Sequence, residues 1–201
     1  MTSLALLLTL ACTAEPEACA DCDTGTEAVV EPYACGWDHG DPGTLESDGA
    51  LVGDTIANMS LYDQCGEEVP LYDFAGVWRI VFATAAWCTT CLDEVAALDD
   101  HGEAFVEESG IPFGYITLLF QGPQGDPAVP QDAPSYHEYV GSPRIPVVSD
   151  PERAFLAATP YDGSVLPGKC LLSPEMELVH CWTGADNDDD ALDMVRAEEG
   201  L

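Results

Sequence analysis

Cys88 and Cys91 are the residues whose type and spacing point most directly to chemistry. They end the stretch WRIVFATAAWCTTC, residues 78–91, in which an apolar run and a tryptophan precede the first cysteine. At the start of a helix, Cys91 would lie one turn beyond Cys88 on the same face and reach a disulfide formed there. The free amides of that turn also favour a thiolate, which is the attacking species. The pattern predicts thiol–disulfide exchange, with attack by Cys88 and resolution by Cys91.

The elements around this pair are predicted to place it between a strand and a helix. Residues 77–83 form an apolar run typical of a buried strand, 84–87 a turn, and 89–107 a helix. The helix should place five apolar residues roughly on one face: Leu92, Val95, Leu98, Phe105 and Val106. Residues 111–120 are again almost unbroken apolar, as expected for a strand covered on both sides.

The rest of the chain supplies one principal domain rather than several. The expected elements are an exposed hairpin within 60–73, a surface loop over 121–135, a short helix over 135–140, a strand within 145–151, a helix over 152–158, a hairpin over 168–183 and a last helix over 188–199. The loop is either a lip that selects substrates or a plain connector. Asp186 or Asn187 is the expected N-cap of the last helix, and capping is preferred over a calcium loop for the DNDDD run because no glycine follows at the required place.

With this strand and helix around it, WCTTC resembles the active site of the thioredoxin superfamily, especially its secreted or membrane-anchored redoxin (TlpA-like) branch. VGDTIANMSLYDQCGEEVPLYDFAG (52–76) is similar to the segment before the first core strand in that family, and VLPGKCLLSPEMELVHCWTG (165–184) to its last hairpin. The resemblance covers roughly residues 52–197. It implies a thioredoxin-like α/β fold, in which helices flank a central mixed β-sheet that carries an N-terminal hairpin extension.

The resemblance also implies roles for individual residues. Pro167 would follow Leu166 through a cis peptide bond and shape the substrate groove, with Trp87, Thr89 and Thr90 beside it. Glu94 matches a glutamate that many TlpA-like reductases place beside their cysteines, and would handle the Cys91 proton; the alternative is a solvated carboxylate.

The sequence departs from related families at several positions. Phe82 replaces the buried acid of thioredoxins proper. Ala85 and Val81 replace the threonine and proline that peroxiredoxins require, so peroxidase activity is disfavoured. Copper-delivery relatives use Cys-x-x-x-Cys, one residue longer than the spacing here.

The N-terminus resembles an export signal. Residues 4–11 are apolar but too short to span a bilayer, and TLAC (9–12) resembles a bacterial lipobox. We therefore expect a signal peptide of the lipoprotein type over 1–11, lipidation of Cys12, an acidic tether over 12–50 and the thioredoxin-like domain over 51–201. Thr9 and the absence of Lys or Arg before the apolar run depart from the usual lipobox, so a plain secreted protein or a buried N-terminal segment are the alternatives. The expected location is the bacterial cell envelope, with the domain lipid-anchored in the periplasm or on the cell surface.

The nine cysteines agree with an oxidising compartment. Apart from Cys12, Cys88 and Cys91, six remain as candidates for structural disulfides: Cys19, Cys22, Cys35, Cys65, Cys170 and Cys181. Their connectivity is open. Cys170 and Cys181 fit a cross-strand bridge or two buried free thiols. The segment YACGW (33–37) is either part of a mobile linker or a patch that docks on the domain through Cys35.

The charge of the chain excludes some partners. Thirty-seven acidic against five basic residues give a formal net charge of −32, which would repel nucleic acids and anionic membrane surfaces. Such a surface resembles those of proteins from salty environments. The negative field should also oppose the helix dipole and raise the pKa of Cys88. The four histidines, His39, His101, His137 and His180, lack metal-ligand spacing, and neither a metal nor a cofactor is expected.

Together these features predict a monomeric thiol–disulfide oxidoreductase of the envelope that acts on protein thiols and disulfides. Thr89 and Thr90 bring neither charge nor histidine to stabilise a thiolate, which favours a reductant over a strong oxidant. Two alternatives remain: a binding or structural module that uses residues 88–91 as a staple, and a metallochaperone-like protein that holds Cu(I) between the cysteines. A staple should be buried, whereas a working site should expose Cys88.

Overall fold

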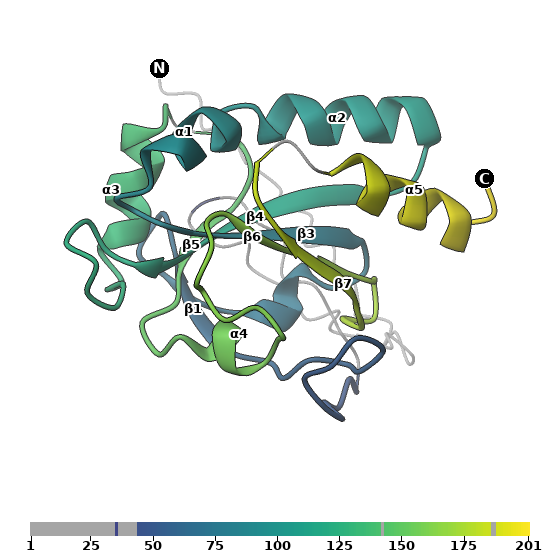
Figure 1. Cartoon of the computed structure of the whole chain (residues 1–201), viewed down its shortest axis with the longest axis horizontal. Coiled ribbons are helices and arrows are strands. Elements are labelled where there is room, and N and C mark those ends of the chain that lie inside the picture. The colour runs from purple at the N-terminus through teal and green to yellow at the C-terminus, as the bar shows by residue number, and fades with distance from the viewer. Residues whose placement is uncertain (1–34, 36–43, 142, 186–187) are drawn as a thin grey trace, which may run out of the picture.

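A seven-stranded mixed sheet forms the centre of the computed structural model, which describes Cys35 and residues 44–141, 143–185 and 188–201 (Figure 1). The strand order is β2-β1-β5-β4-β3-β6-β7. The strands are β1 (Ser60–Asp63), β2 (Glu68–Pro70), β3 (Trp78–Ala85), β4 (Phe113–Gln121), β5 (Val147–Ser149), β6 (Gly168–Leu172) and β7 (Leu178–Thr183). The helices are α1 (Thr89–Val95), α2 (Leu98–Ser109), α3 (Asp132–Tyr139), α4 (Ala154–Ala157), α5 (Asp189–Glu198) and the 3-10 helix η1 (Leu71–Phe74).

The strands β3 and β4 are the centre of the sheet, as the apolar runs predict. They pair in parallel, β4 also pairs in parallel with β5, and β6 lies antiparallel on the other side of β3. Every residue of β3 except Arg79 is buried, because both faces of the sheet are covered. The strand is longer than predicted: Thr84 and Ala85, expected in the turn, still pair with β4.

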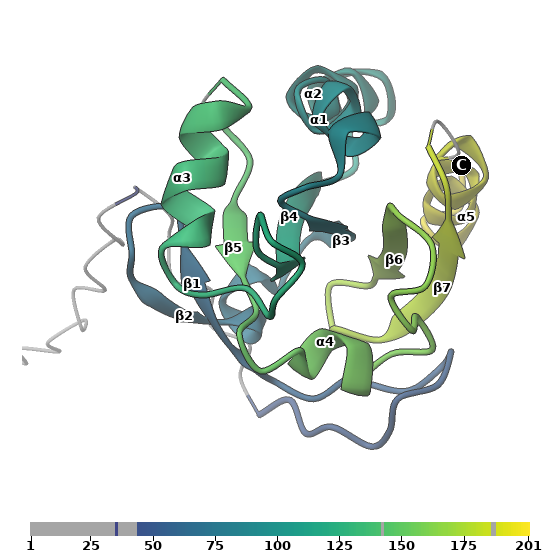
Figure 2. The same cartoon turned by 60° about the vertical axis from the view of Figure 1, so that its left-hand side comes forward.

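Helices cover both faces of the sheet. α1, α2, α3 and α5 lie on one face, while α4 lies on the opposite face (Figure 2). Alternate residues of β3 divide the core accordingly. Ile80 and Phe82 belong to the cluster that contains Cys88 and Cys91, whereas Val81 and Ala83 belong to the cluster that contains η1 and α4.

The helix predicted over 89–107 is wrong in one respect, because the structure divides it into α1 and α2. The chain tightens at Ala97, whose amide donates to the Glu94 carbonyl at 2.9 Å, three residues back. Val95, Leu98 and Phe105 are buried as predicted, but Val106 is exposed. Cys88 and Cys91 therefore lie at the N-terminal end of a helix of seven residues, and the dipole that would favour a thiolate is that of a short helix.

The N-terminal hairpin is present, but it is less exposed than predicted. β1 pairs with both β2 and β5, so the hairpin extends the main sheet, and Leu61 and Val69 are fully buried. A disulfide joins Cys65, in the hairpin turn, to Cys35. The disulfide thus attaches Cys35 to the domain at the edge of the sheet.

The C-terminal hairpin closes the other edge of the sheet. β6 and β7 are antiparallel, and the disulfide Cys170–Cys181 joins directly opposed residues, which rules out two free thiols in this structure. α5 begins after Asp188, whose side chain makes no capping hydrogen bond. The predicted caps Asp186 and Asn187 lie outside the described residues, as do Cys12, Cys19 and Cys22.

Two shorter helices also differ from their predicted bounds. α3 begins at Asp132, inside the predicted loop, and α4 is shorter than the helix predicted over 152–158. The Asp150 carboxylate accepts the amides of Ala154 and Phe155, each at 2.9 Å, and so holds the start of α4. No described helix is long and apolar enough to cross a membrane.

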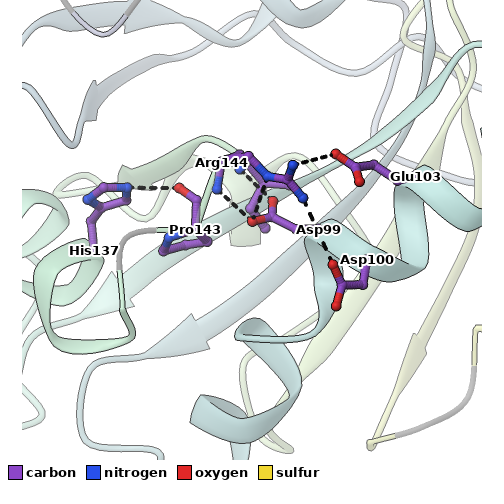
Figure 3. A network of polar contacts seen from close by, with 7 residues as sticks. Asp99, Asp100, Glu103, His137, Pro143 and Arg144 are labelled. Carbon is purple, nitrogen blue, oxygen red and sulfur yellow. Dashed lines mark hydrogen bonds and ion pairs between the residues drawn. The ribbon is translucent and has the colours of Figure 1, made fainter.

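A polar network fastens the chain before β5 to the start of α2 (Figure 3). The Asp99 carboxylate accepts the backbone amides of Arg144 at 2.7 Å and Ile145 at 2.9 Å. Ion pairs link the Arg144 guanidinium to Asp99, Asp100 and Glu103, and His137 donates to the Pro143 carbonyl. This network ties α2, and with it the end of α1, to the central sheet.

Candidate active site

The Cys88–Cys91 disulfide lies where β3 gives way to α1. Cys88 is the N-cap residue of α1, with φ −77° and ψ 94°, and its amide donates to the Ala85 carbonyl at 2.9 Å. Cys91 lies in the first turn of the helix, and its Cα is 5.4 Å from that of Cys88. The strand and helix hold the two sulfur atoms together, as the spacing predicts.

The two cysteines differ in exposure. Cys91 is fully buried, and Cys88 is 5% exposed. In this oxidised form Cys88 is thus more covered than the sequence led us to expect for a working site. Thr89 and Thr90 are exposed beside it, and the Thr90 hydroxyl lies 3.5 Å from the Cys88 sulfur. Only the Cys88 side of the disulfide meets the surface.

Trp87 forms an apolar rim beside the disulfide. Its side chain is half exposed, and the indole N–H donates to the Gln121 side chain at 3.0 Å. A pocket of about 270 Å³ begins next to it, lined by Ala86, Pro123, Asp132, Ser135, Tyr136 and Tyr139. Pro123 and Asp132 come from the stretch predicted as a lip or a connector. The contribution of α3 was missed by sequence analysis, because nothing in the sequence shows that α3 packs beside residue 86.

Pro167 follows Leu166 through a cis peptide bond, as the resemblance predicts. The next residue, Gly168, pairs with Ala83 of β3, so Pro167 lies beside the end of the strand that leads to the cysteines. Leu166 packs against the core cluster that contains Cys88 and Cys91. A side chain at Gly168 would meet the Tyr161 ring, since its Cβ would lie 2.1 Å away.

Glu94 is buried rather than solvated, and it forms an ion pair with Lys169. The Lys169 ammonium also pairs with Asp188 at 2.5 Å, and the Tyr115 hydroxyl donates to the other Asp188 oxygen at 2.9 Å. Burial, and next the charge of Asp188, raises the pKa of Tyr115 well above its usual value. Sequence analysis missed Lys169, Asp188 and Tyr115. A signal was present, however: Lys169 is the only lysine of the chain and lies in an apolar strand.

A second pocket, of about 360 Å³, lies behind this network. Glu94 and Asp188 line it together with His101, Ala104, Phe105, Glu108, Tyr115, Asp189, Leu192 and Arg196. The buried ion pairs therefore meet a hollow that lies among α1, α2, α5 and β4.

His180 stacks on Trp182, with ring centroids 5.5 Å apart, and His39 lies outside the described residues. Within the described part of the chain, no group of three or more His, Cys, Asp or Glu side chains is arranged to hold a metal ion.

Comparison with known proteins agrees with this geometry. The AhpC/TSA family model matches residues 52–115, which run from before β1 into β4 and include both cysteines. The exposed lipoprotein thioredoxin of Streptococcus pneumoniae has a similar structure, with a TM-score of 0.56 and 22% identity over 70% of this chain and 99% of that one. The chain has a thioredoxin-like fold.

Other solved structures that share this fold differ in their named activities. Copper-bound ScoI of Arabidopsis thaliana has a TM-score of 0.55 and 20% identity, over 72% of this chain and 98% of that one. The peroxidoxin BcpB of Mycobacterium tuberculosis has a TM-score of 0.58 and 17% identity, over 74% and 97%. No curated protein sequence matches the chain. At these identities the likeness concerns the fold, so the activity has to be argued from the residues of the site.

Proposed function

We propose that this protein with a thioredoxin-like fold is a thiol–disulfide oxidoreductase that acts through Cys88 and Cys91. The observation that carries the proposal is the asymmetry of the pair: one disulfide at a strand-to-helix junction has a surface-facing Cys88 and a buried Cys91. A nucleophile must reach its substrate, whereas a resolving thiol needs to reach only the nucleophile.

The proposed reaction has two steps. The Cys88 thiolate attacks a substrate disulfide and forms a mixed disulfide, and one substrate thiolate leaves. Cys91 then attacks the Cys88 sulfur, forms the Cys88–Cys91 disulfide and releases the second substrate thiolate. The Cys91 proton passes to Glu94, which lies one turn along the same helix face and is also buried.

The exposed rim supplies the proposed substrate contacts. Trp87 offers an apolar surface beside Cys88, and the exposed Thr89 and Thr90 offer hydroxyl groups. Leu166 and Pro167 lie at the end of β3, where an extended substrate segment would run. Protein disulfides are the proposed substrates.

We propose the reducing direction. Thr89 and Thr90, between the cysteines, carry no positive charge that would stabilise the Cys88 thiolate, and a strong oxidant depends on a stabilised reduced form. Equilibration with glutathione should therefore give a reduction potential below about −150 mV. A higher value would overturn the direction but not the exchange chemistry.

The proposed location is the bacterial cell envelope, with Cys12 lipidated and the domain in the periplasm or on the cell surface. Support comes from the lipobox-like TLAC and from the likeness to a protein named as an exposed lipoprotein thioredoxin. Two disulfides outside the site, Cys35–Cys65 and Cys170–Cys181, also suit an oxidising compartment. Mass spectrometry of the envelope-expressed protein should find a diacylglycerol-modified Cys12 at the N-terminus.

The deciding experiment is a mixed-disulfide trap in the native envelope. Cys91→Ser should retain substrate proteins covalently on Cys88, and Cys88→Ser should retain none. One observation favours a different function: the low exposure of Cys88 would suit a structural staple. If the trap stays empty while the wild-type disulfide survives mild reductant, the staple is the better interpretation.

A further inference from the structure

We propose that Lys169 is a positioning residue for Glu94, and that Glu94, Lys169 and Asp188 form a proton path between Cys91 and the pocket behind α1. This inference rests on the proposed function, since it concerns the proton that Cys91 loses when it resolves the mixed disulfide. It assigns a role to the three ion-paired side chains and to the pocket they line.

The burial of Lys169 is the first observation. Its side chain is fully buried, and its ammonium group forms ion pairs with Glu94 and Asp188, whose side chains are 6% and 13% exposed. A buried ammonium is costly unless it is paired and hydrogen-bonded. Here the only lysine of the chain bridges two carboxylates rather than one. Such an arrangement fixes the orientation of both carboxylates.

The sheet register explains how Lys169 reaches Glu94. Lys169 stands directly opposite Phe82 in the β3–β6 pair, and its ammonium lies 5.5 Å from the centroid of the Phe82 ring. Phe82 itself occupies the position where thioredoxins proper carry a buried acid. The lysine ammonium thus lies over the Phe82 ring and pairs with Glu94 of α1, so the ionisable groups of the site come from α1 and β6.

Glu94 is one turn from Cys91 on α1, and both side chains are buried. The Lys169 ammonium donates hydrogen bonds to the carboxylates of Glu94 and Asp188. The Tyr115 hydroxyl donates to the second carboxylate oxygen of Asp188. Glu94 and Asp188 both line the pocket of about 360 Å³. A proton accepted by Glu94 therefore has a hydrogen-bonded route through Lys169 and Asp188 to the pocket.

The charged and titratable groups around this path come from four elements. They are Glu94 on α1, His101 and Glu108 on α2, Tyr115 on β4, Asp189 and Arg196 on α5, and Asp188 just before α5. Among the pocket-lining acids, Asp189 makes no ion pair with Lys169, which makes Asp189→Asn a matched control for the loss of one negative charge.

The Cys91 thiol gives its proton to the Glu94 carboxylate as its sulfur bonds to the Cys88 sulfur. The bond between Cys88 and the substrate breaks, and the substrate leaves as a thiolate with the electron pair of that bond. The proton then leaves Glu94 along the path, which restores the carboxylate. The protein dithiol is oxidised, and the substrate disulfide is reduced.

A two-phase reaction with dithiodipyridine separates this step from the attack by Cys88. This aromatic disulfide is uncharged, so the net charge of −32 does not repel it. The full chain is used with Cys12, Cys19 and Cys22 changed to serine; Cys35, Cys65, Cys170 and Cys181 are paired in the structure. After reduction under mild conditions, Cys88 releases the first thiopyridone and Cys91 releases the second. Cys91→Ser should show the first phase alone.

Lys169→Met and Glu94→Gln should each slow the second phase by about tenfold or more at neutral pH and change the first phase by less than about twofold. Their second-phase rate should also rise by about tenfold per pH unit, because an unassisted thiol must lose its proton to hydroxide. A merely structural role would not produce this pH profile. Asp189→Asn should match the parent protein in both phases.

Asp188→Asn covers the case in which Lys169→Met does not fold, as judged by near-ultraviolet circular dichroism. It should slow the second phase by about threefold or more, because the outer carboxylate of the path is lost. An unchanged second phase in a folded Lys169→Met protein, or in Asp188→Asn when Lys169→Met does not fold, would overturn the inference. The absence of a Cys88-dependent first phase would instead overturn the proposed function.

Discussion

Asp99 should contribute far more to stability than the ion pairs around it. Its carboxylate accepts two backbone amides, those of Arg144 and Ile145, and its side chain is 15% exposed. Hydrogen bonds to a charged acceptor contribute about 1.5–3 kcal/mol each to stability. In Asp99→Ala, hydrogen bonds from the freed amides to water offset part of that loss. Asp99→Ala should therefore lower the free energy of unfolding by about 2–4 kcal/mol.

Two neighbours provide the matched controls. Arg144→Ala removes the side-chain ion pairs but leaves both hydrogen bonds from the backbone amides to Asp99, and the Arg144 side chain is exposed to solvent. Asp100→Ala removes another acid of the first turn of α2, which also controls for the helix dipole. Both should leave stability nearly unchanged. Asp99→Asn keeps one acceptor oxygen, and we expect roughly half of the loss seen in Asp99→Ala.

Urea unfolding, followed by far-ultraviolet circular dichroism, measures these differences. The midpoint should fall for Asp99→Ala while the slope stays constant, because the surface exposed on unfolding is the same. If Arg144→Ala proves as destabilising as Asp99→Ala, then the ion pairs shown in Figure 3, rather than the hydrogen bonds from the two backbone amides, hold residues 143–146.

Three further predictions concern the rest of the molecule. Burial raises the pKa of Tyr115, Tyr136 and Tyr161, so their contribution to stability is present below the pKa of an unfolded tyrosine, about 10, and is lost as the pH rises beyond it. In an alkaline titration, tyrosinate absorbance and far-ultraviolet circular dichroism should therefore change together. Ionisation of all three tyrosines without unfolding would contradict this. Replacing both Cys170 and Cys181 by alanine should lower the free energy of unfolding in urea by about 3 kcal/mol, the chain-entropy value for a sequence separation of 11, and a change below about 1 kcal/mol would refute that origin. Gly168→Ala should lower the stability in thermal unfolding by about 1–3 kcal/mol, because its Cβ would lie 2.1 Å from the Tyr161 ring. Gly102→Ala in α2, where the Cβ would lie 3.5 Å from Tyr115, should instead raise the stability by about 0.5–1 kcal/mol. The opposite order would show that the close approach of Tyr161 is not what limits substitution at Gly168.

The central strands and the cysteine site could be predicted because their signals are local. β3 and β4 are apolar runs within two residues of their predicted ends, and two cysteines at a strand-to-helix junction depend only on neighbouring sequence. The cis peptide bond before Pro167 was predicted through the family resemblance, which transfers a position rather than deriving it.

The break between α1 and α2 could not be predicted, because Ala96, Ala97 and Leu98 all favour a continuous helix. The break appears only in the structure, where the Ala97 amide donates to the carbonyl three residues back. The Glu94–Lys169 pair joins residues 75 positions apart, and only the strand order brings them together. The same holds for the disulfide between Cys35 and Cys65, since six cysteines allow 15 pairings without a topology.

Chemical labelling of the single lysine can report on unfolding of the protein. Lys169 supplies the only side-chain amine in 201 residues, and the folded domain covers it completely. An amine-reactive reagent can therefore modify a side chain only when the domain opens, and each modified molecule gains one label there. Because Lys169 lies in β6, within the central sheet, the labelling rate reports on opening of the core rather than on fraying of the chain ends.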